Sequence, residues 1–185
     1  MRGIRNAIVL GALVCAGCQA SASLPGNSPQ VTPAAAEGAT ALKPADIKLV
    51  TGDAKALAAM IAEYKGNVVF VDFWATWCGP CVASFPHTVE ISKKFKDQVV
   101  ATIAVSFDNL DSEPAVREFL AKQGADFENL LSKYDGVNQE AAVDFDVEAI
   151  PQYRLYDRQG NRRFKWEGTS DEIEARIQEL LAEKP

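Results

Sequence analysis

The stretch that decides the fold is residues 68–86, VVFVDFWATWCGPCVASFP, in which an apolar run leads into two cysteines separated by Gly-Pro. Val68–Phe73 is apolar on both faces except for Asp72, as is typical of a central strand covered by helices on each side. A helix is predicted to follow from Gly79 to Lys96. Pro86 should kink that helix, because proline removes one backbone donor and clashes with the preceding turn.

The two cysteines, Cys78 and Cys81, stand where the predicted strand gives way to the helix. Unpaired N–H groups and the dipole at a helix N-terminus favour a thiolate over a thiol, so Cys78 is predicted to be the nucleophile. Cys81 lies one turn further on and can reach Cys78 along the same helix face. It should be more buried, which makes it the resolving thiol.

Asp72 is the one carboxylate in the apolar strand. Burial on both faces would raise its pKa and impose a desolvation cost that core packing alone does not explain. We predict that Asp72 transfers a proton to and from Cys81, directly or through a water, when a mixed disulfide is resolved. The alternative is a structural aspartate at the end of a strand, bonded to backbone amides.

Three other polar residues are given structural interpretations. His87, the only histidine, lies outside the Cys-x-x-C motif and is expected on the solvent face of its helix. Ser106 and Asp108 lie at the end of a second apolar run. We expect them to end a strand rather than to act chemically.

The N-terminal residues have the pattern of an export signal. Arg2 and Arg5 precede the apolar run Ala7–Val14, which is far shorter than the about 20 residues of a membrane-spanning helix. The sequence VCAGCQA that follows resembles a bacterial lipobox. This resemblance implies a signal peptide of residues 1–17 and lipidation of Cys18, with ordinary signal cleavage a few residues further on as the alternative.

Residues 18–44 are rich in Ala, Ser, Pro, Thr and Gly, so they cannot bury enough apolar surface to fold. They are predicted to be a flexible tether between a lipid anchor and a folded domain of residues 45–185. Without Cys15 and with Cys18 lipidated, the mature chain keeps one closely spaced pair of cysteines. Such a pair indicates a chemically active role rather than a structural disulfide, because closing so short a loop adds little to the stability of the fold.

Length and composition limit the possible classes of protein. A chain of 185 residues fits one compact domain with extensions, and 48% hydrophobic residues suffice for a core. The net charge of -6 comes without a clustered Lys/Arg surface, which argues against a nucleic-acid partner.

The rest of the domain is predicted to alternate between strands and helices. Strands are predicted at Ile47–Val50, Val99–Phe107, Gln152–Tyr156 and Arg162–Trp166, and helices at Ala54–Tyr64, Pro114–Lys122, Asn138–Phe145 and Ser170–Glu183. The last two strands flank a turn at Asp157–Asn161, and no element is predicted for residues 125–137. This order predicts an α/β domain with a mixed sheet.

Residues 68–86 resemble the active-site segment of the thioredoxin superfamily, with its W-C-G-P-C motif between a strand and a helix. Over residues 45–185 the chain most resembles the exported TlpA/ResA-like thiol-disulfide oxidoreductases. The resemblance implies a thioredoxin fold, in which a central mixed β-sheet is flanked by helices and an insert separates the second and third core strands. It also implies a redox-active disulfide between Cys78 and Cys81.

The same resemblance implies which residues meet a substrate. Trp77 shields the nucleophile, and Gly79 and Pro80 lie between the cysteines, where glycine lets a partner backbone approach. Pro151, after Ile150, is the cis-proline that borders the disulfide and holds the substrate backbone.

The chain departs from that exported group at two positions. The group commonly carries Glu-x-Pro in the active-site helix, whereas this chain has Ser84, Phe85 and Pro86. Many members have a neutral residue where this chain has Asp72. Both departures bear on the subfamily and therefore on the substrate.

The predicted function is that of a thiol-disulfide oxidoreductase that reduces disulfides in exported proteins, with apocytochrome c as one candidate substrate. Gly79 and Pro80 supply no charge or side-chain donor to the thiolate, which favours a reducing couple. The alternatives are a copper-binding chaperone that uses the cysteine pair, and a disulfide oxidase or isomerase.

No cofactor and no metal ion is expected. The expected partners are protein thiols and disulfides, a membrane electron donor and, through the lipid anchor, a membrane, but no nucleic acid. We expect a monomer on the periplasmic side of a bacterial membrane.

Overall fold

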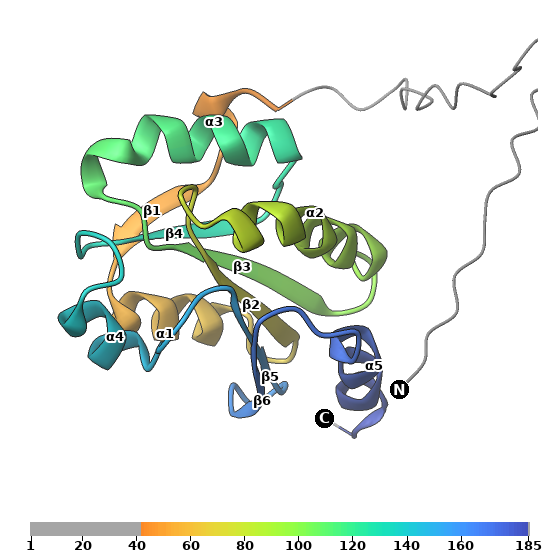
Figure 1. The fold of residues 1–185 in the computed structure, drawn as a ribbon. Helices are drawn as coiled ribbons and strands as arrows, with labels where there is room; N and C mark the ends of the chain where they lie inside the picture. Colours follow the sequence, from red (N-terminus) through yellow and green to blue (C-terminus); the bar gives the residue numbers. More distant parts are fainter. Residues whose placement is uncertain (1–41, 185) are drawn as a thin grey trace, which may run out of the picture. The chain divides into compact units, whose positions relative to one another are not determined.

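The computed structural model describes residues 42–184, which are built around one six-stranded sheet (Figure 1). The predicted signal segment 1–17, the lipidation site Cys18 and linker residues 19–41 lie outside the described residues. Within residues 42–184, no helix is both long and apolar enough to cross a membrane. The elements in chain order are η1 (Pro44–Asp46), β1 (Leu49–Gly52), α1 (Ala54–Glu63), β2 (Val68–Trp74), α2 (Gly79–Lys94), β3 (Val100–Ser106), η2 (Leu110–Ser112), α3 (Glu113–Gln123), β4 (Glu128–Ser132), α4 (Gln139–Phe145), β5 (Gln152–Tyr156), β6 (Arg162–Glu167) and α5 (Ile173–Ala182).

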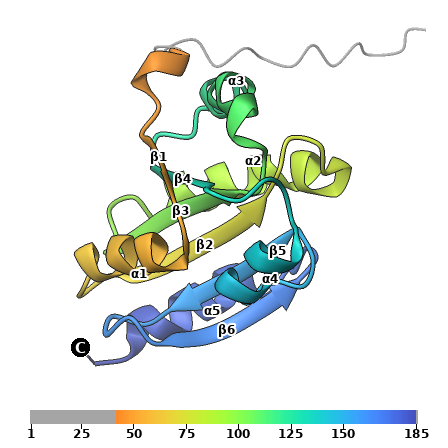
Figure 2. The ribbon, with the colours of Figure 1, turned by 90° about the vertical axis from the view of Figure 1, so that its left-hand side faces the viewer.

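The sheet has the strand order β1-β4-β3-β2-β5-β6. The first four of these strands pair in parallel, whereas β5 is antiparallel to β2, and β6 is antiparallel to β5. Helices α2, α3 and α5 pack on one face and α1 and α4 on the other, as Figures 1 and 2 show. The mixed α/β fold expected from the sequence is confirmed, with α3, β4 and α4 inserted between β3 and β5.

Strand β2 lies at the centre of the sheet, and all seven of its side chains are buried. Phe70 and Trp74 pack under α2 and its neighbours, while Val71 and Phe73 pack on the opposite face with α1 and α4. The central strand covered on both faces is therefore confirmed. The helix that follows it contains Pro86, as predicted.

Strand β1 begins two residues later than predicted. Ile47 is the C-cap residue of η1, and its N–H donates to the carbonyl of Pro44 at 3.4 Å rather than to a neighbouring strand. Pairing with β4 starts at Leu49, opposite Asn129. The prediction of a strand from Ile47 was wrong because the amide of Ile47 closes the short helical turn that precedes the strand.

Two further differences concern elements with polar residues. Strand β4 lies in a stretch for which no element is predicted; the Asn129 amide in it is buried and donates to the carbonyls of Lys48 and Phe127 at 3.1 and 2.7 Å. Helix α5 starts at Ile173 rather than Ser170, whose hydroxyl accepts a hydrogen bond from the Glu172 amide in the turn before the helix.

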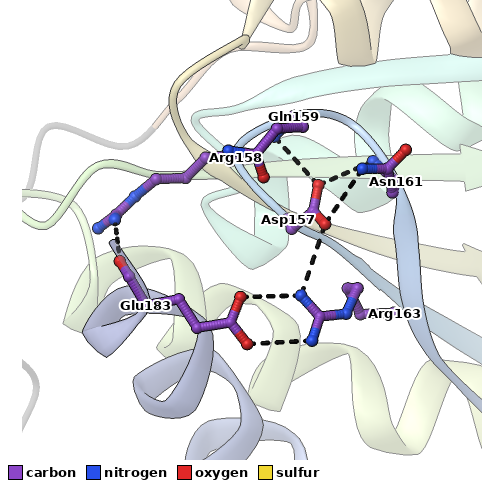
Figure 3. A network of polar contacts seen from close by, with 6 residues as sticks. All are labelled: Asp157, Arg158, Gln159, Asn161, Arg163 and Glu183. Atoms are coloured by element: carbon purple, nitrogen blue, oxygen red, sulfur yellow. Dashed lines mark hydrogen bonds and ion pairs between the residues drawn. The ribbon is translucent and has the colours of Figure 1, made fainter. Parts of the chain in front are cut away.

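The predicted turn between the last two strands is held by Asp157, whose Oδ1 accepts from the amides of Gln159 and Asn161 at 3.0 and 2.9 Å. Arg163 pairs with both Asp157 and Glu183, which ties this turn to the chain just after α5 (Figure 3). Burial raises the pKa of Asp157, but the hydrogen bonds from Asn161, Gln159 and Arg163 outweigh burial and hold the pKa below its ordinary value.

Candidate active site

Cys78 and Cys81 are joined by a disulfide at the start of α2. Cys78 is the N-cap residue of that helix, and its Sγ accepts a hydrogen bond of 3.3 Å from the amide of Cys81. Cys78 is 7% exposed and Cys81 only 1%. The disulfide and the deeper burial of Cys81 agree with the sequence-based expectation, and the donated N–H is of the kind that favours a thiolate on Cys78 once the pair is reduced.

The loop before β5 borders the disulfide on one side. The peptide between Ile150 and Pro151 is cis, as the resemblance implied, and the Ile150 carbonyl oxygen lies 3.8 Å from Cys78 Sγ. Trp77, the residue before Cys78, is 59% exposed. A Cβ placed on Gly79 would meet nothing within 4 Å, so the residue that follows Cys78 faces open space.

Asp72 lies in the middle of β2, opposite Ala104 of β3 and Tyr153 of β5. It is 1% exposed, and its Oδ2 accepts a hydrogen bond of 2.6 Å from the hydroxyl of Thr88. Its Oδ1 has no hydrogen-bond partner within residues 42–184. The alternative of a strand-end aspartate bonded to backbone amides is therefore wrong.

Burial raises the pKa of Asp72 to about 7, and the Thr88 hydrogen bond opposes the rise only in part. A carboxylic acid with such a pKa can hold or release a proton near neutral pH. Thr88 is seven residues beyond Cys81, or about 10 Å along the helix axis. Asp72 is therefore hydrogen-bonded to the third turn of α2, whereas Cys81 lies in its first turn.

A second buried carboxylate, Asp108, anchors the loop that leads into the cysteines. Its Oδ2 accepts from the Thr76 amide at 3.0 Å and from the Ser106 hydroxyl at 2.6 Å, while its Oδ1 accepts from the Thr76 hydroxyl. Ser106 ends β3, as predicted. The role of Asp108 in holding Thr76, two residues before Cys78, was missed, although an aspartate directly after a buried strand next to β2 is a signal for it.

The sequence also gave no indication of a buried tyrosine beside the cysteines. The Tyr153 hydroxyl donates to Ser84 Oγ at 2.8 Å, and Ser84 Oγ donates to the carbonyl of Cys81 at 3.2 Å. Burial, and secondarily the charge of Asp72, raises the pKa of Tyr153 above its ordinary value, so the hydroxyl keeps its proton at neutral pH. The two hydroxyls connect β5 to the first turns of α2.

The remaining polar residues have structural or surface positions. His87 is half-buried on α2, with its Nδ1 3.8 Å from a carboxylate oxygen of Glu90. Among the described residues, no three His, Cys, Asp or Glu side chains come together as a metal site.

The chain is similar in sequence to redox proteins. A family model described as Redoxin matches residues 36–179. The chain is 29% identical over 122 residues to the thiol-disulfide oxidoreductase ResA of Bacillus thuringiensis subsp. konkukian, a match that spans 65% of this chain and 67% of that protein. It is 32% identical over 100 residues to ResA of Bacillus subtilis, with 54% of this chain and 52% of that protein covered.

Solved structures show the same fold. A Chlorobium tepidum protein described as a DsbE-type thiol:disulfide interchange protein superposes with a TM-score of 0.57 and 29% identity, over 66% of this chain and 85% of that one. A thiol-disulfide isomerase from Corynebacterium glutamicum superposes with a TM-score of 0.58 and 22% identity, over 66% and 86% of the two chains. The second likeness concerns the fold alone.

Proposed function

The chain belongs to the Redoxin family and is a thiol-disulfide oxidoreductase, and we propose that it reduces disulfide bonds in other exported proteins. The observation that carries this proposal is the Cys78–Cys81 disulfide at the start of α2, with open space beside it at Gly79. Cys78 is the more exposed of the two cysteines and lies at a helix N-terminus, where a thiolate is favoured.

In the first step, the Cys78 thiolate attacks one sulfur of a substrate disulfide. The substrate S–S bond breaks, a mixed disulfide forms between Cys78 and that sulfur, and the other substrate sulfur leaves as a thiolate. In this proposal, the reacting sulfur is surrounded by residues that would contact the substrate, namely Trp77, Pro80, Ile150 and Pro151.

In the second step, Cys81 loses its proton to Asp72 and attacks Cys78 Sγ. The Cys78–Cys81 disulfide forms, and the second substrate sulfur leaves as a thiolate that takes up a proton. The substrate has then gained two electrons and the cysteine pair has lost two. Two properties of Asp72 support its assignment as the base. Its pKa is near 7, and one of its buried carboxylate oxygens has no hydrogen-bond partner among the described residues.

The direction of electron flow is proposed from the residues between the cysteines. Gly79 and Pro80 bring no charged group or side-chain donor to the Cys78 thiolate. A less stabilised thiolate corresponds to a more reducing pair, since the strongly oxidising DsbA owes its potential to a stabilised reduced form. A reducing pair in an oxidising compartment needs electrons, and we propose a membrane electron donor as their source.

The location follows from the N-terminal sequence. We propose that residues 1–17 are a signal peptide, that Cys18 is lipidated, and that residues 18–44 tether a domain of residues 45–185 to a bacterial membrane on its periplasmic side. This arrangement would keep the dithiol close to a membrane donor. Apocytochrome c is one substrate class that such a monomeric reductase would serve.

A trapping experiment tests the proposed function. A Cys81→Ser form cannot resolve the mixed disulfide, so it should hold exported proteins covalently through Cys78, and reductant should release them. A Cys78→Ser form is the matched control and should hold none. Equal capture by the two forms, or no disulfide-linked protein on Cys81→Ser, would contradict a role in reducing protein disulfides.

A further inference from the structure

A cavity of about 210 Å³ lies between α2, β5 and the segment that precedes α5. It is lined by Ser84 and His87 of α2, Tyr153 of β5, and Thr169, Ser170 and Asp171 before α5. Since a water molecule takes about 30 Å³ in the liquid, the cavity has room for a group of several heavy atoms. None of the residues just named takes part in the proposed redox steps.

The cavity adjoins the reactive cysteines. Ser84 is one turn beyond Cys81 and is bonded to its carbonyl, while Tyr153 follows Pro151 by two residues. From Cys78 to Ser84 the helix rises about 9 Å, which is close to the length of three extended residues. A peptide held on Cys78 by a disulfide can therefore place a nearby side chain in the cavity.

The hydrogen bonds inside the cavity favour a ligand that donates. The Tyr153 proton is directed at Ser84 Oγ, and the Ser84 proton is directed at the carbonyl of Cys81. Each hydroxyl has one proton and two lone pairs, so what these two oxygens can still offer to a ligand is lone pairs. A group with many N–H donors suits such a wall.

The charged groups at the cavity also favour a ligand that donates hydrogen bonds, in particular a cation. The cavity lining contains Asp171 and His87, whose Nδ1 lies 3.8 Å from a carboxylate oxygen of Glu90, but no lysine or arginine. Of the acids at the start of α5, Glu172 pairs with Arg176 at 3.6 Å and Glu174 pairs with Lys94, whereas Asp171 takes part in no ion pair in the described part of the chain. Asp171 is exposed, so its carboxylate is accessible to an incoming cation.

We propose that this cavity is a substrate subsite for the cationic side chain of a lysine or arginine that lies within three residues of the reacting cysteine. The inference rests on the proposed reduction of protein disulfides and adds the class of sequence that is preferred. The cation would pair with Asp171 and donate hydrogen bonds to the oxygens of Tyr153 and Ser84.

The test uses the full chain, reduced beforehand, and three disulfide-linked peptides that differ at one position. Two residues from the cysteine, the peptides carry arginine, norleucine or glutamate. Single-turnover reduction should be about tenfold faster for arginine than for glutamate, as expected for one charge-assisted contact. Asp171→Asn should lower this ratio at least threefold, and Tyr153→Phe, which removes one acceptor, should lower it too.

The matched control is Asp97→Asn, the same change at an exposed residue beyond the far end of α2. It should keep the wild-type ratio, which separates the cavity from the overall negative charge of the protein. An arginine-to-glutamate ratio that is equal in wild type and Asp171→Asn would overturn the subsite while leaving the reductase intact. Failure of the wild type to reduce any of the peptides would overturn the proposed function, and the subsite with it.

Discussion

The hydroxyl of Thr88 donates a hydrogen bond of 2.6 Å to Oδ2 of Asp72, under the helix that begins at the two cysteines. It is the one hydrogen bond that the Asp72 carboxylate receives in the described part of the chain, since Oδ1 has no partner there. A buried carboxylate with a single donor is poorly compensated for the water it has lost. This explains why the pKa of Asp72 rises to about 7.

The first prediction concerns stability against pH. In the unfolded chain Asp72 ionises near pH 4, whereas in the fold it ionises near 7. Between these values the folded state holds a proton that the unfolded state has lost, so this residue makes stability fall as pH rises and level off above 7. At pH 8, Asp72→Asn should be more stable than wild type by more than about 1.4 kcal/mol, the free energy of one pKa unit. Urea unfolding from pH 4 to 9 checks this.

Two variants serve as controls for that measurement. Thr88→Val removes the donor that lowers the pKa of Asp72, so the fall in stability should extend to higher pH. Asp157→Asn changes a buried aspartate whose pKa is held low, so it should destabilise the protein at pH 8. If Asp72→Asn and Asp157→Asn changed the unfolding free energy at pH 8 by the same amount, burial would not be destabilising the ionised form of Asp72.

The second prediction concerns resolution of the mixed disulfide. As the base for Cys81, Asp72 must be ionised, so the rate of resolution should rise with pH through about 7. Asp72→Asn should slow resolution by about a hundredfold or more, within the range of general-base catalysis, and leave formation of the mixed disulfide nearly unchanged. Rapid-mixing kinetics with a disulfide-linked reporter separates the two steps. Unchanged resolution in Asp72→Asn would make the carboxylate structural.

The third prediction concerns the division of labour between the thiols. In the reduced protein Cys78 should react with iodoacetamide at neutral pH much faster than Cys81, because it is the more exposed and caps the helix N-terminus. Mass mapping after short exposure measures both rates. Equal rates, or faster labelling of Cys81, would contradict the assignment of Cys78 as the nucleophile.

The fourth prediction concerns the anchor of the active-site loop. Asp108→Ala leaves the buried Ser106 hydroxyl and the Thr76 donors without their acceptor, and should cost about 2 kcal/mol of unfolding free energy. Because Thr76 and Asp108 form these hydrogen bonds with each other, Thr76→Ala should lower the unfolding free energy much less in the Asp108→Ala variant than in the wild type. Additive effects in denaturant unfolding would show that the contact does not hold the loop.

Much of the site could be predicted from local sequence. The apolar run of β2 required burial on both faces, and Cys78 at a strand-to-helix junction required a helix N-terminus. Those two features also placed Asp72 in the core, because a residue in a strand covered on both sides cannot reach water.

What escaped prediction depends on contacts between distant residues. The buried Asn129 of β4 is tolerated because the carbonyls of Lys48 and Phe127 accept from its side-chain amide, and Lys48 lies 81 residues away in the sequence. The partners Thr88, Tyr153 and Thr76 lie 16, 69 and 32 residues from the groups they bind. Hydrophobic periodicity and motif spacing describe one segment at a time, so they do not predict contacts between residues this far apart.

The reduction potential of the Cys78–Cys81 pair tests the central claim most directly, because it decides between a reductase and an oxidase or isomerase. Equilibration of the full chain with glutathione buffers of known ratio, read out by thiol labelling, gives this value. With Gly79 and Pro80 between the cysteines, we expect a potential nearer the roughly -270 mV of thioredoxin than the roughly -120 mV of DsbA. A potential above about -180 mV, the level of protein disulfide isomerase, would contradict the reductase.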